Sequence, residues 1–198
     1  MTNGVPAPFL RAGELMILPI LKISDEDKAP SAGLRQTSID VTEFNEELER
    51  IVESMIETLL LYHAGGLSAP QIGRNLNLFV MRTGAGSQNN RTVRVVINPK
   101  TLTEAGEDIG TPNEKLEGCL SVPGVLGLVT RCHEVDFVYC DESGKHHRES
   151  LSGREARIYQ HEGDHLRGVL FVDKAKAFYP IGHRFAETDR MLRAAGRD

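Results

Sequence analysis

Apolar residues recur between Leu48 and Leu60 with the period of an α-helix. They fall at i, i+3, i+4, i+7, i+8, i+11 and i+12, so they share one helical face. The residues are Leu48, Ile51, Val52, Met55, Ile56, Leu59 and Leu60. We interpret this stripe as the core-packing face of a scaffold helix. Asp40 or Thr42 is expected to cap its start, and Gly65-Gly66 to end it.

Short stretches with the composition of β-strands follow this helix. Residues 78–81 (Leu-Phe-Val-Met) and 93–97 (Val-Arg-Val-Val-Ile) predict two strands, and Asn98-Pro99 is expected to close the second. Apolar and polar residues alternate at 135–139, as they do in a half-buried strand. The cluster at 141–144 (Asp-Glu-Ser-Gly) predicts a turn into a returning strand.

A second helix is predicted from about Ser152 to Leu166. Ser152 and Glu155 have the spacing of a capping box, which satisfies two free amide donors at a helix start. Gly168 stands just past the predicted end, where glycine commonly terminates a helix. Because helices and strands mix without a regular βαβ alternation, we expect an α+β fold rather than a doubly wound one.

The length of 198 residues suits one compact domain with a core, so we expect a single domain over residues 1–198. A net charge of -5 argues against a general or sequence-specific nucleic-acid binder. Three cysteines are too few, and odd in number, for a disulfide framework. The apolar run at 15–21 is short and interrupted by proline, so it predicts neither a signal peptide nor a membrane span. These features predict a cytoplasmic protein without a membrane partner.

The second helix contains the sequence His161-Glu162-Gly163-Asp164-His165. Two histidines four residues apart lie on one helical face, so both imidazoles can reach one cation. The glutamate beside the first histidine can carry a proton for a water bound to that cation. Gly163 costs about 1 kcal/mol against alanine inside a helix, and close approach of another segment would explain it.

A catalytic metal site needs a third protein ligand and one open position. The candidates are a cysteine, another histidine or a carboxylate. Cys119 is one of them, because Gly118 before it lets the backbone bend and leaves the sulfur reachable. From composition alone, a buried thiol is the favoured interpretation of Cys119. Residues 65–73 (Gly-Gly-Leu-Ser-Ala-Pro-Gln-Ile-Gly) predict a tight loop, in which Gln71 alone would be a solvated side chain.

Taken together, three segments resemble the three motifs of the peptide deformylase family. They are residues 66–73 (Gly-Leu-Ser-Ala-Pro-Gln-Ile-Gly), 117–121 (Glu-Gly-Cys-Leu-Ser) and 160–168 (Gln-His-Glu-Gly-Asp-His-Leu-Arg-Gly). Their order and separations also resemble that family, over roughly residues 15 to 175. The resemblance implies a compact α+β domain with short, mostly antiparallel strands around a central helix that carries the HExxH motif. It implies removal of the N-formyl group from the formylmethionine of nascent polypeptides, with release of formate.

The resemblance also implies a role for particular residues. The metal ligands would be Cys119, His161 and His165, and Glu162 would be the general acid and base. Gln71 and the backbone N–H of Leu120 would stabilise the oxyanion. The backbone of Gly65, Gly66 and Leu67 would hold the peptide in strand-like pairing. The family's metal is usually Fe²⁺, with Ni²⁺, Co²⁺ or Zn²⁺ able to occupy the site.

This chain departs from the family's pattern at three positions. Ala64 stands where the family often has the first glycine of its first motif, and Ser68 replaces a common alanine. Both are small, so we expect little effect. Leu126 takes the place of an arginine that some relatives carry after Ser121-Val122-Pro123, which argues against a charged contact with the substrate from that loop.

Two other functions would fit part of the sequence. A general HExxH metalloprotease would use a distant glutamate or a third histidine and would leave Cys119 without a role. A protein with a structural metal would need a fourth protein ligand, which only Cys132 or Cys140 could supply. Residues 184–198 contain four arginines. They are expected to form a solvated helix or tail, or else a basic helix that contacts the ribosome transiently.

Overall fold

In a computed structural model, residues 16–23, 32–84, 92–102 and 113–181 can be described. Three α-helices and a 3₁₀ helix lie in these ranges: α2 Glu46–Leu61, η1 Ala69–Ile72, α3 Gly153–Leu166 and α4 Phe171–Lys174. The strands there are β1 Gly66–Ser68, β2 Leu78–Thr83, β3 Thr92–Thr101, β4 Asn113–Cys119, β5 Val122–Arg131, β6 Glu134–Cys140, β7 His146–Ser152 and β8 Phe178–Pro180. The predicted tail at 184–198 lies outside the described residues.

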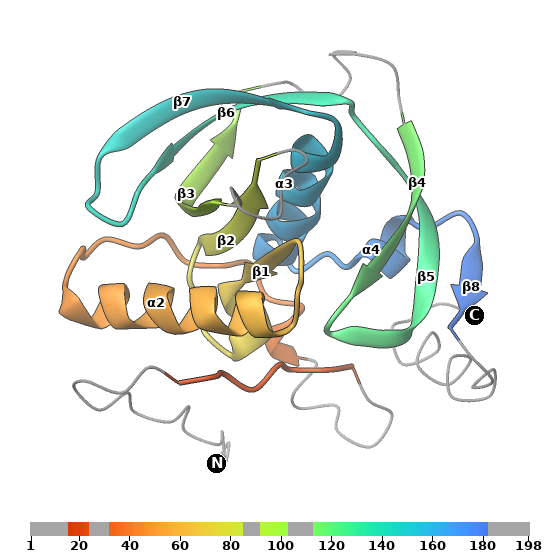
Figure 1. The fold of residues 1–198 in the computed structure, drawn as a ribbon, viewed down its shortest axis with the longest axis horizontal. Helices are drawn as coiled ribbons and strands as arrows, with labels where there is room; N and C mark the ends of the chain where they lie inside the picture. The colour runs from red at the N-terminus through yellow and green to blue at the C-terminus, as the bar shows by residue number, and fades with distance from the viewer. Residues whose placement is uncertain (1–15, 24–31, 85–91, 103–112, 182–198) are drawn as a thin grey trace.

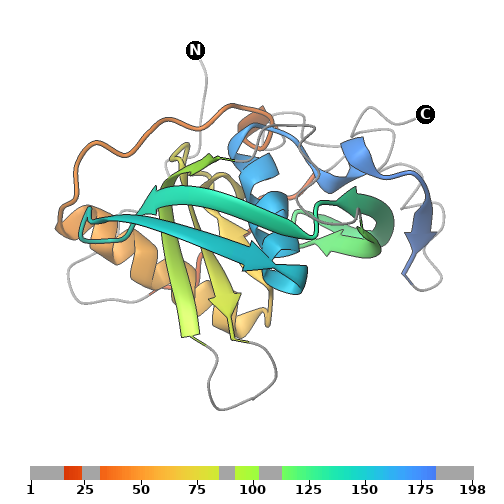
Figure 2. The same cartoon turned by 90° about the horizontal axis from the view of Figure 1, so that it is seen from above.

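Two antiparallel sheets surround α3, as Figures 1 and 2 show. The larger sheet has the strand order β1-β2-β3-β6-β7, and the smaller has β4-β5-β8. Every strand pair in both sheets is antiparallel. Helix α3 packs against β1, β2 and β7, and α2 covers β2 and β1. The prediction of an α+β domain with antiparallel strands around a central helix is therefore confirmed.

Helix α2 buries most of the predicted stripe. Six of its members pack in or against one core cluster with β2 and β3, but Leu60 is 39% exposed. The predicted caps were wrong. Asn45 is the N-cap, because its side chain accepts from the backbone N–H groups of Glu47 and Leu48. The helix ends at Leu61, and the predicted terminator Gly66 instead begins β1.

Helix α3 has the predicted bounds and N-cap residue, but not the predicted capping box. Ser152 is the N-cap residue, and its side chain makes no capping hydrogen bond. The carboxylate of Glu155 instead accepts from the backbone N–H of Gly84, at the end of β2. Glu155 therefore fastens α3 to the large sheet.

Strand β3 does not end at Asn98-Pro99, as the sequence predicted. It continues to Thr101 across a change of register between Ile97 and Lys100. Asn98 sits in this bulge with a φ of 51°. Its amide side chain bonds the backbone N–H and carbonyl of Val41. A bulge thus replaces the strand end that a proline suggests.

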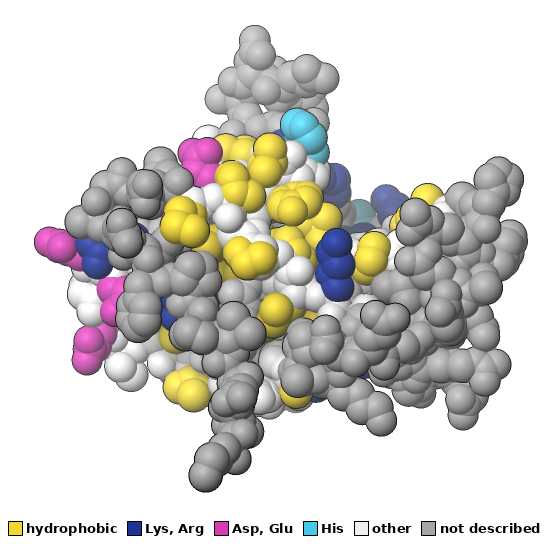
Figure 3. Space-filling model, turned by 90° about the horizontal axis from the view of Figure 1, so that it is seen from below, with side chains coloured by type: hydrophobic (Ala, Val, Ile, Leu, Met, Phe, Trp, Pro, Cys, Tyr) yellow, Lys and Arg dark blue, Asp and Glu magenta, His cyan; other side chains and the backbone are white. Residues whose placement is uncertain are grey.

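Exposed apolar residues gather at the C-terminal end of α2. Leu60, Leu61 and Tyr62 are 39%, 56% and 46% exposed. Figure 3, seen from the side on which α2 lies, shows hydrophobic side chains grouped near the centre of that face. Among the described residues, no helix has the length and apolar run needed to cross a bilayer.

Gly168 provides a test of the contact that closes α3. Its φ is +72°, and an added Cβ would overlap the carbonyl group of Arg35. We expect Gly168→Ala to lower the free energy of unfolding by more than the roughly 1 to 2 kcal/mol that the left-handed backbone alone costs. Gly153→Ala is the matched control, because its φ is +57° and the nearest atom to the added Cβ is 3.9 Å away. Equal losses for the two variants in urea unfolding would contradict this explanation.

Candidate active site

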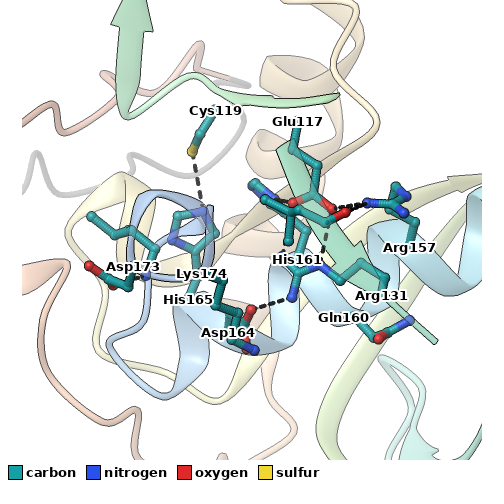
Figure 4. Close-up of polar contacts among 12 residues, drawn as sticks. Glu117, Cys119, Arg131, Arg157, Gln160, His161, Asp164, His165, Asp173 and Lys174 are labelled. Atoms are coloured by element: carbon teal, nitrogen blue, oxygen red, sulfur yellow. Dashed lines mark hydrogen bonds and ion pairs between the residues drawn. The ribbon is translucent and has the colours of Figure 1, made fainter. Parts of the chain in front are cut away.

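Cys119, His161 and His165 come together between the two sheets. One donor atom from each lies within 4.8 Å of the others. The sulfur of Cys119 is 3.2 Å from Nε2 of His165, as Figure 4 shows. Cys132 and Cys140 are not part of this group, since Cys132 is exposed and Cys140 contacts His146. The structure therefore assembles three donors of the kind that bind a divalent metal ion.

The local folds that supply these donors are a helix and a hairpin. His161 and His165 stand one turn apart on α3, so their imidazoles share a face. Cys119 is the last residue of β4 and pairs with Val122 across a tight turn. The register shifts between Glu117 and Cys119, which turns the cysteine toward α3. The sequence analysis predicted no strand at Cys119, whereas the structure has an antiparallel hairpin there.

Glu117 positions His161. Its carboxylate lies 3.0 Å from Nδ1 of His161, which leaves Nε2 facing the donor group. The same carboxylate accepts from Arg131 at 3.0 and 2.9 Å and from Arg157 at 2.6 Å. The buried Glu117 carboxylate is thus held by two arginines and His161. Sequence reasoning placed Glu117 in a motif without giving it a role.

A second carboxylate completes the buried ion network around Arg131. Asp164 accepts from Arg131, and it also accepts from Lys174 at 2.8 Å and Arg167 at 2.7 Å. The side chains of Arg131 and Asp164 are each 2% exposed. The network joins α3 to β4, β5 and α4, as Figure 4 shows in part. Asp164, the acidic residue before His165 in the motif, was the only feature of the sequence that indicated this ion network.

Gln71 is buried and held in one orientation, not solvated. Its side-chain carbonyl accepts from the backbone N–H and the hydroxyl of Ser68. Its amide nitrogen is 3.2 Å from the hydroxyl of Ser121 and 3.4 Å from the sulfur of Cys119. The amide donor therefore points into the site, and Ser68 contributes a second hydrogen bond that the usual alanine could not.

Glu162 is buried next to the donor group and against β1. Its Oε2 has no hydrogen-bond partner among the described residues. A Cβ on Gly66 would lie 2.5 Å from the other carboxylate oxygen, so only glycine fits there. The explanation offered for Gly163 was wrong, because a Cβ there would meet only the side chain of Arg167 at 3.7 Å. The close approach to α3 occurs at Gly66.

A pocket of about 480 Å³ opens beside these residues. β1 and β4 are the end strands of their sheets, and each contributes to the pocket wall. Its lining residues are Ala64, Gly65, Gly66, Gln71, Leu116, Glu117, Gly118, Cys119, Leu120, Arg154, Arg157, Ile158, His161 and Glu162. Leu67 lies behind this wall, fully buried in the core. The pocket thus joins the donor group to two strand edges that pair with no other described strand.

Burial and the neighbouring charged groups shift the pKa values of the site residues in opposite directions. Burial disfavours the thiolate of Cys119, but His165 and His161 hold the pKa of this thiol well below its usual value. Burial also works against a charged His161, but its bonds with Cys119 and Glu117 raise its pKa to about 10. Burial raises the pKa of Glu162, against the pull of the two histidines. A metal-free site therefore holds protons that a cation must displace on binding.

The donor set fits one divalent metal ion. A thiolate and two imidazoles are ligands that suit several divalent metals, and three protein ligands leave a position open for water or substrate. The unpartnered, buried oxygen of Glu162 lies beside that group. An α+β domain with such a site in an open pocket belongs to the class of mononuclear metallohydrolases.

Comparison with known proteins places the chain within that class. The family model for polypeptide deformylase matches residues 17–179. The peptide deformylases of Thermotoga neapolitana and Thermoanaerobacter pseudethanolicus are 41% and 40% identical over 72% and 80% of this chain, and over 81% and 89% of theirs. The chain belongs to the polypeptide deformylase family, the metal-dependent enzymes that remove the N-formyl group from nascent polypeptides.

Solved structures of the family share the fold. The crystal structure of the Thermotoga maritima peptide deformylase has a TM-score of 0.70 and 34% identity, over 82% of this chain and 99% of that one. The Synechococcus elongatus enzyme in complex with actinonin has a TM-score of 0.71 and 33% identity, over 91% and 89%. The resemblance seen in the sequence is therefore confirmed, and the protease and structural-metal alternatives are set aside.

Arg131 is expected to carry much of the stability of the site. Arg131→Met would leave Glu117 and Asp164 buried without their shared cation, a loss of about 3 to 5 kcal/mol. The control is Arg50→Met, because Arg50 makes an i,i+4 pair with an exposed glutamate. That change should cost no more than about 0.5 kcal/mol. Similar free energies of unfolding for the two variants would show that the buried network adds nothing.

Acid should weaken the same network. Arg131 and its neighbours overcome burial and hold the pKa values of Glu117 and Asp164 below those of free carboxyls. A carboxyl with a lowered pKa stabilises the fold above its unfolded value of about 4, and this contribution is lost as the pH falls below that value. We expect the urea midpoint of metal-free protein to drop between pH 5 and pH 3. Arg131→Met should flatten this dependence, and an unchanged slope in that variant would contradict it.

Proposed function

We propose that Cys119, His161 and His165 bind the metal ion with which this chain deformylates nascent peptides. The observation that carries the proposal is the meeting of these three donors beside Glu162, in a pocket with two open strand edges. The ion supplies Lewis acidity and lowers the pKa of water, which provides a nucleophile near neutral pH. Fe²⁺ is proposed as the ion in the cell, and Ni²⁺, Co²⁺ or Zn²⁺ are proposed to replace it in purified protein.

Glu162 is the proposed general acid and base. Its buried Oε2 has no partner in the described part of the chain, and burial raises the pKa of its carboxyl. A carboxylate in this position takes the proton of the attacking water and later gives it to the departing amine. Gly66 keeps the carboxylate in place, because no other side chain fits against it.

Gln71 and the backbone N–H of Leu120 are the proposed oxyanion donors. The Gln71 amide is fixed by Ser68, so it does not have to reorganise when charge develops on the formyl oxygen. Leu120 lies in the turn directly after Cys119 and lines the pocket. A fixed donor of this kind is typically worth about 3 to 4 kcal/mol in the transition state.

The backbone of residues 65–67 is the proposed holder of the peptide. Among the described strands, β1 pairs only with β2, through pairs such as Gly66 with Met81. Its other edge is free to pair with an extended peptide. A crystal structure of the class I type b peptide deformylase from Acinetobacter baumannii contains bound Met-Ala-Ser, which supports an N-terminal methionyl peptide as occupant.

We further propose a cytoplasmic location, one catalytic domain, and transient contact with the ribosome through residues 184–198.

Formyl-Met-Ala-Ser and acetyl-Met-Ala-Ser are the substrates to compare, with anaerobically purified protein that carries Fe²⁺ or Ni²⁺. The formyl carbon bears only hydrogen on one side, so it is less hindered and more electrophilic than the acetyl carbon. We expect rapid release of formate and an intact acetyl peptide. If fully metallated, folded protein turned over neither peptide, the proposed function would be wrong.

Two substitutions separate metal binding from catalysis. Glu162→Gln is expected to keep the metal and to lose about 10² to 10⁴ in kcat, the usual contribution of general acid–base catalysis. Cys119→Ala is expected to lose both metal and activity. Glu155→Gln is the control on the same helix, because Glu155 contacts Gly84 and not the site. Metal content by atomic emission and formate release by a coupled assay would check all three, and full activity of Glu162→Gln would refute the assigned role.

A further inference from the structure

The pocket follows one face of α3 away from the metal ligands. Arg154, Ile158 and His161 line it at positions i, i+4 and i+7, so they share a face of the helix. Seven residues of α-helix span about 10 Å. Arg154 therefore stands two turns from His161, at the outer end of the pocket wall.

The two arginines that line this wall, Arg154 and Arg157, differ in whether their charge is paired with a carboxylate. Arg157 donates to Glu117 and to the backbone carbonyls of Val129 and Asn113. Its charge is therefore matched by a buried carboxylate. Arg154 is exposed, and its side chain has no ion pair or hydrogen bond within the described residues. The neighbouring acid Glu155 is occupied by Gly84.

The Arg154 guanidinium lies next to the backbone that is proposed to hold the substrate. A Cβ on Gly65 would be 3.6 Å from Nη2 of Arg154 and 3.2 Å from Ile158. The first turn of a helix also carries a positive potential, which adds to the charge of Arg154. Across the pocket, β4 and the turn after it contribute Leu116 and Leu120 to the wall, and the carboxylate of Glu117 there is already paired with arginines.

We propose that Arg154 determines specificity by favouring formyl peptides with a carboxylate on the second or third residue. This inference rests on the proposed function. An extended peptide advances about 3.3 Å per residue, so the distance from His161 to Arg154 corresponds to about three residues. A flexible arginine reaches back over part of that length. With a net charge of -5, the protein as a whole repels acidic peptides, so a preference for them would have to come from a local cation such as Arg154.

The test compares matched formyl peptides whose C-termini are amidated, so that the side chain carries the only varied charge. They are formyl-Met-Ala-Glu, formyl-Met-Glu-Ala, their glutamine counterparts and their lysine counterparts. We expect kcat/KM for the better glutamate peptide to exceed that of its glutamine counterpart about two- to fivefold at low salt, the range of an exposed ion pair. The ratio should fall toward one in 0.5 M salt. The two glutamate peptides show which residue faces Arg154.

Variants of Arg154 test whether this side chain causes the preference for glutamate peptides. Arg154→Gln should bring the glutamate-to-glutamine ratio to about one, and Arg154→Glu should reverse the order of the glutamate and lysine peptides. Arg148→Gln is the matched control, because Arg148 is exposed on β7 and does not line the pocket, so the ratio should persist. A ratio of one in the parent protein, or a ratio that survives Arg154→Gln, overturns the proposal. Either result still leaves turnover of the neutral peptide as evidence for deformylation, whereas no turnover of any peptide refutes the function itself.

Discussion

The buried pairing of Arg131 with Glu117 and Asp164 is the constraint on which the site depends. Each of these side chains is almost fully withdrawn from water, so each must find an opposite charge or unfold the region around it. The two carboxylates come from β4 and α3, and the arginine comes from β5. Bringing them together fixes the hairpin against the helix. The same contacts orient His161, so the ion pairs of Glu117 fix the position of a candidate metal ligand.

Local patterns predicted α2, α3 and the inner strands β2, β3 and β6 of the large sheet. The period of the apolar stripe located α2, and the alternation at 135–139 located β6, because each reports the exposure of a single element. Helix caps were predicted poorly, since several polar residues precede α2 and the path of the chain selects Asn45 among them. Asn98-Pro99 suggested the end of a strand, but β3 continues past this position through a bulge.

Strand β4 escaped the sequence analysis for a physical reason. Residues 113–119 (Asn-Glu-Lys-Leu-Glu-Gly-Cys) are mostly polar, because β4 is an end strand with little buried surface. The ion network was equally hidden, since Arg131 is 14 residues from Glu117 and 33 from Asp164. Contacts between residues so far apart in the chain leave no periodic pattern in the sequence from which they could be predicted. The three motifs located the candidate ligands, and only the fold revealed what holds them.

The two end strands that border the pocket also carry a risk of unwanted assembly. A strand with free N–H and carbonyl groups can pair with any extended chain, including an edge of another copy of the protein. β1 has only three residues, which limits the hydrogen bonds that such a pairing could make. β4 presents the exposed, charged side chains of Glu114 and Lys115, and charges of this kind oppose edge-to-edge growth. The pocket that is proposed to accept a short peptide is thereby less prone to nucleate an aggregate.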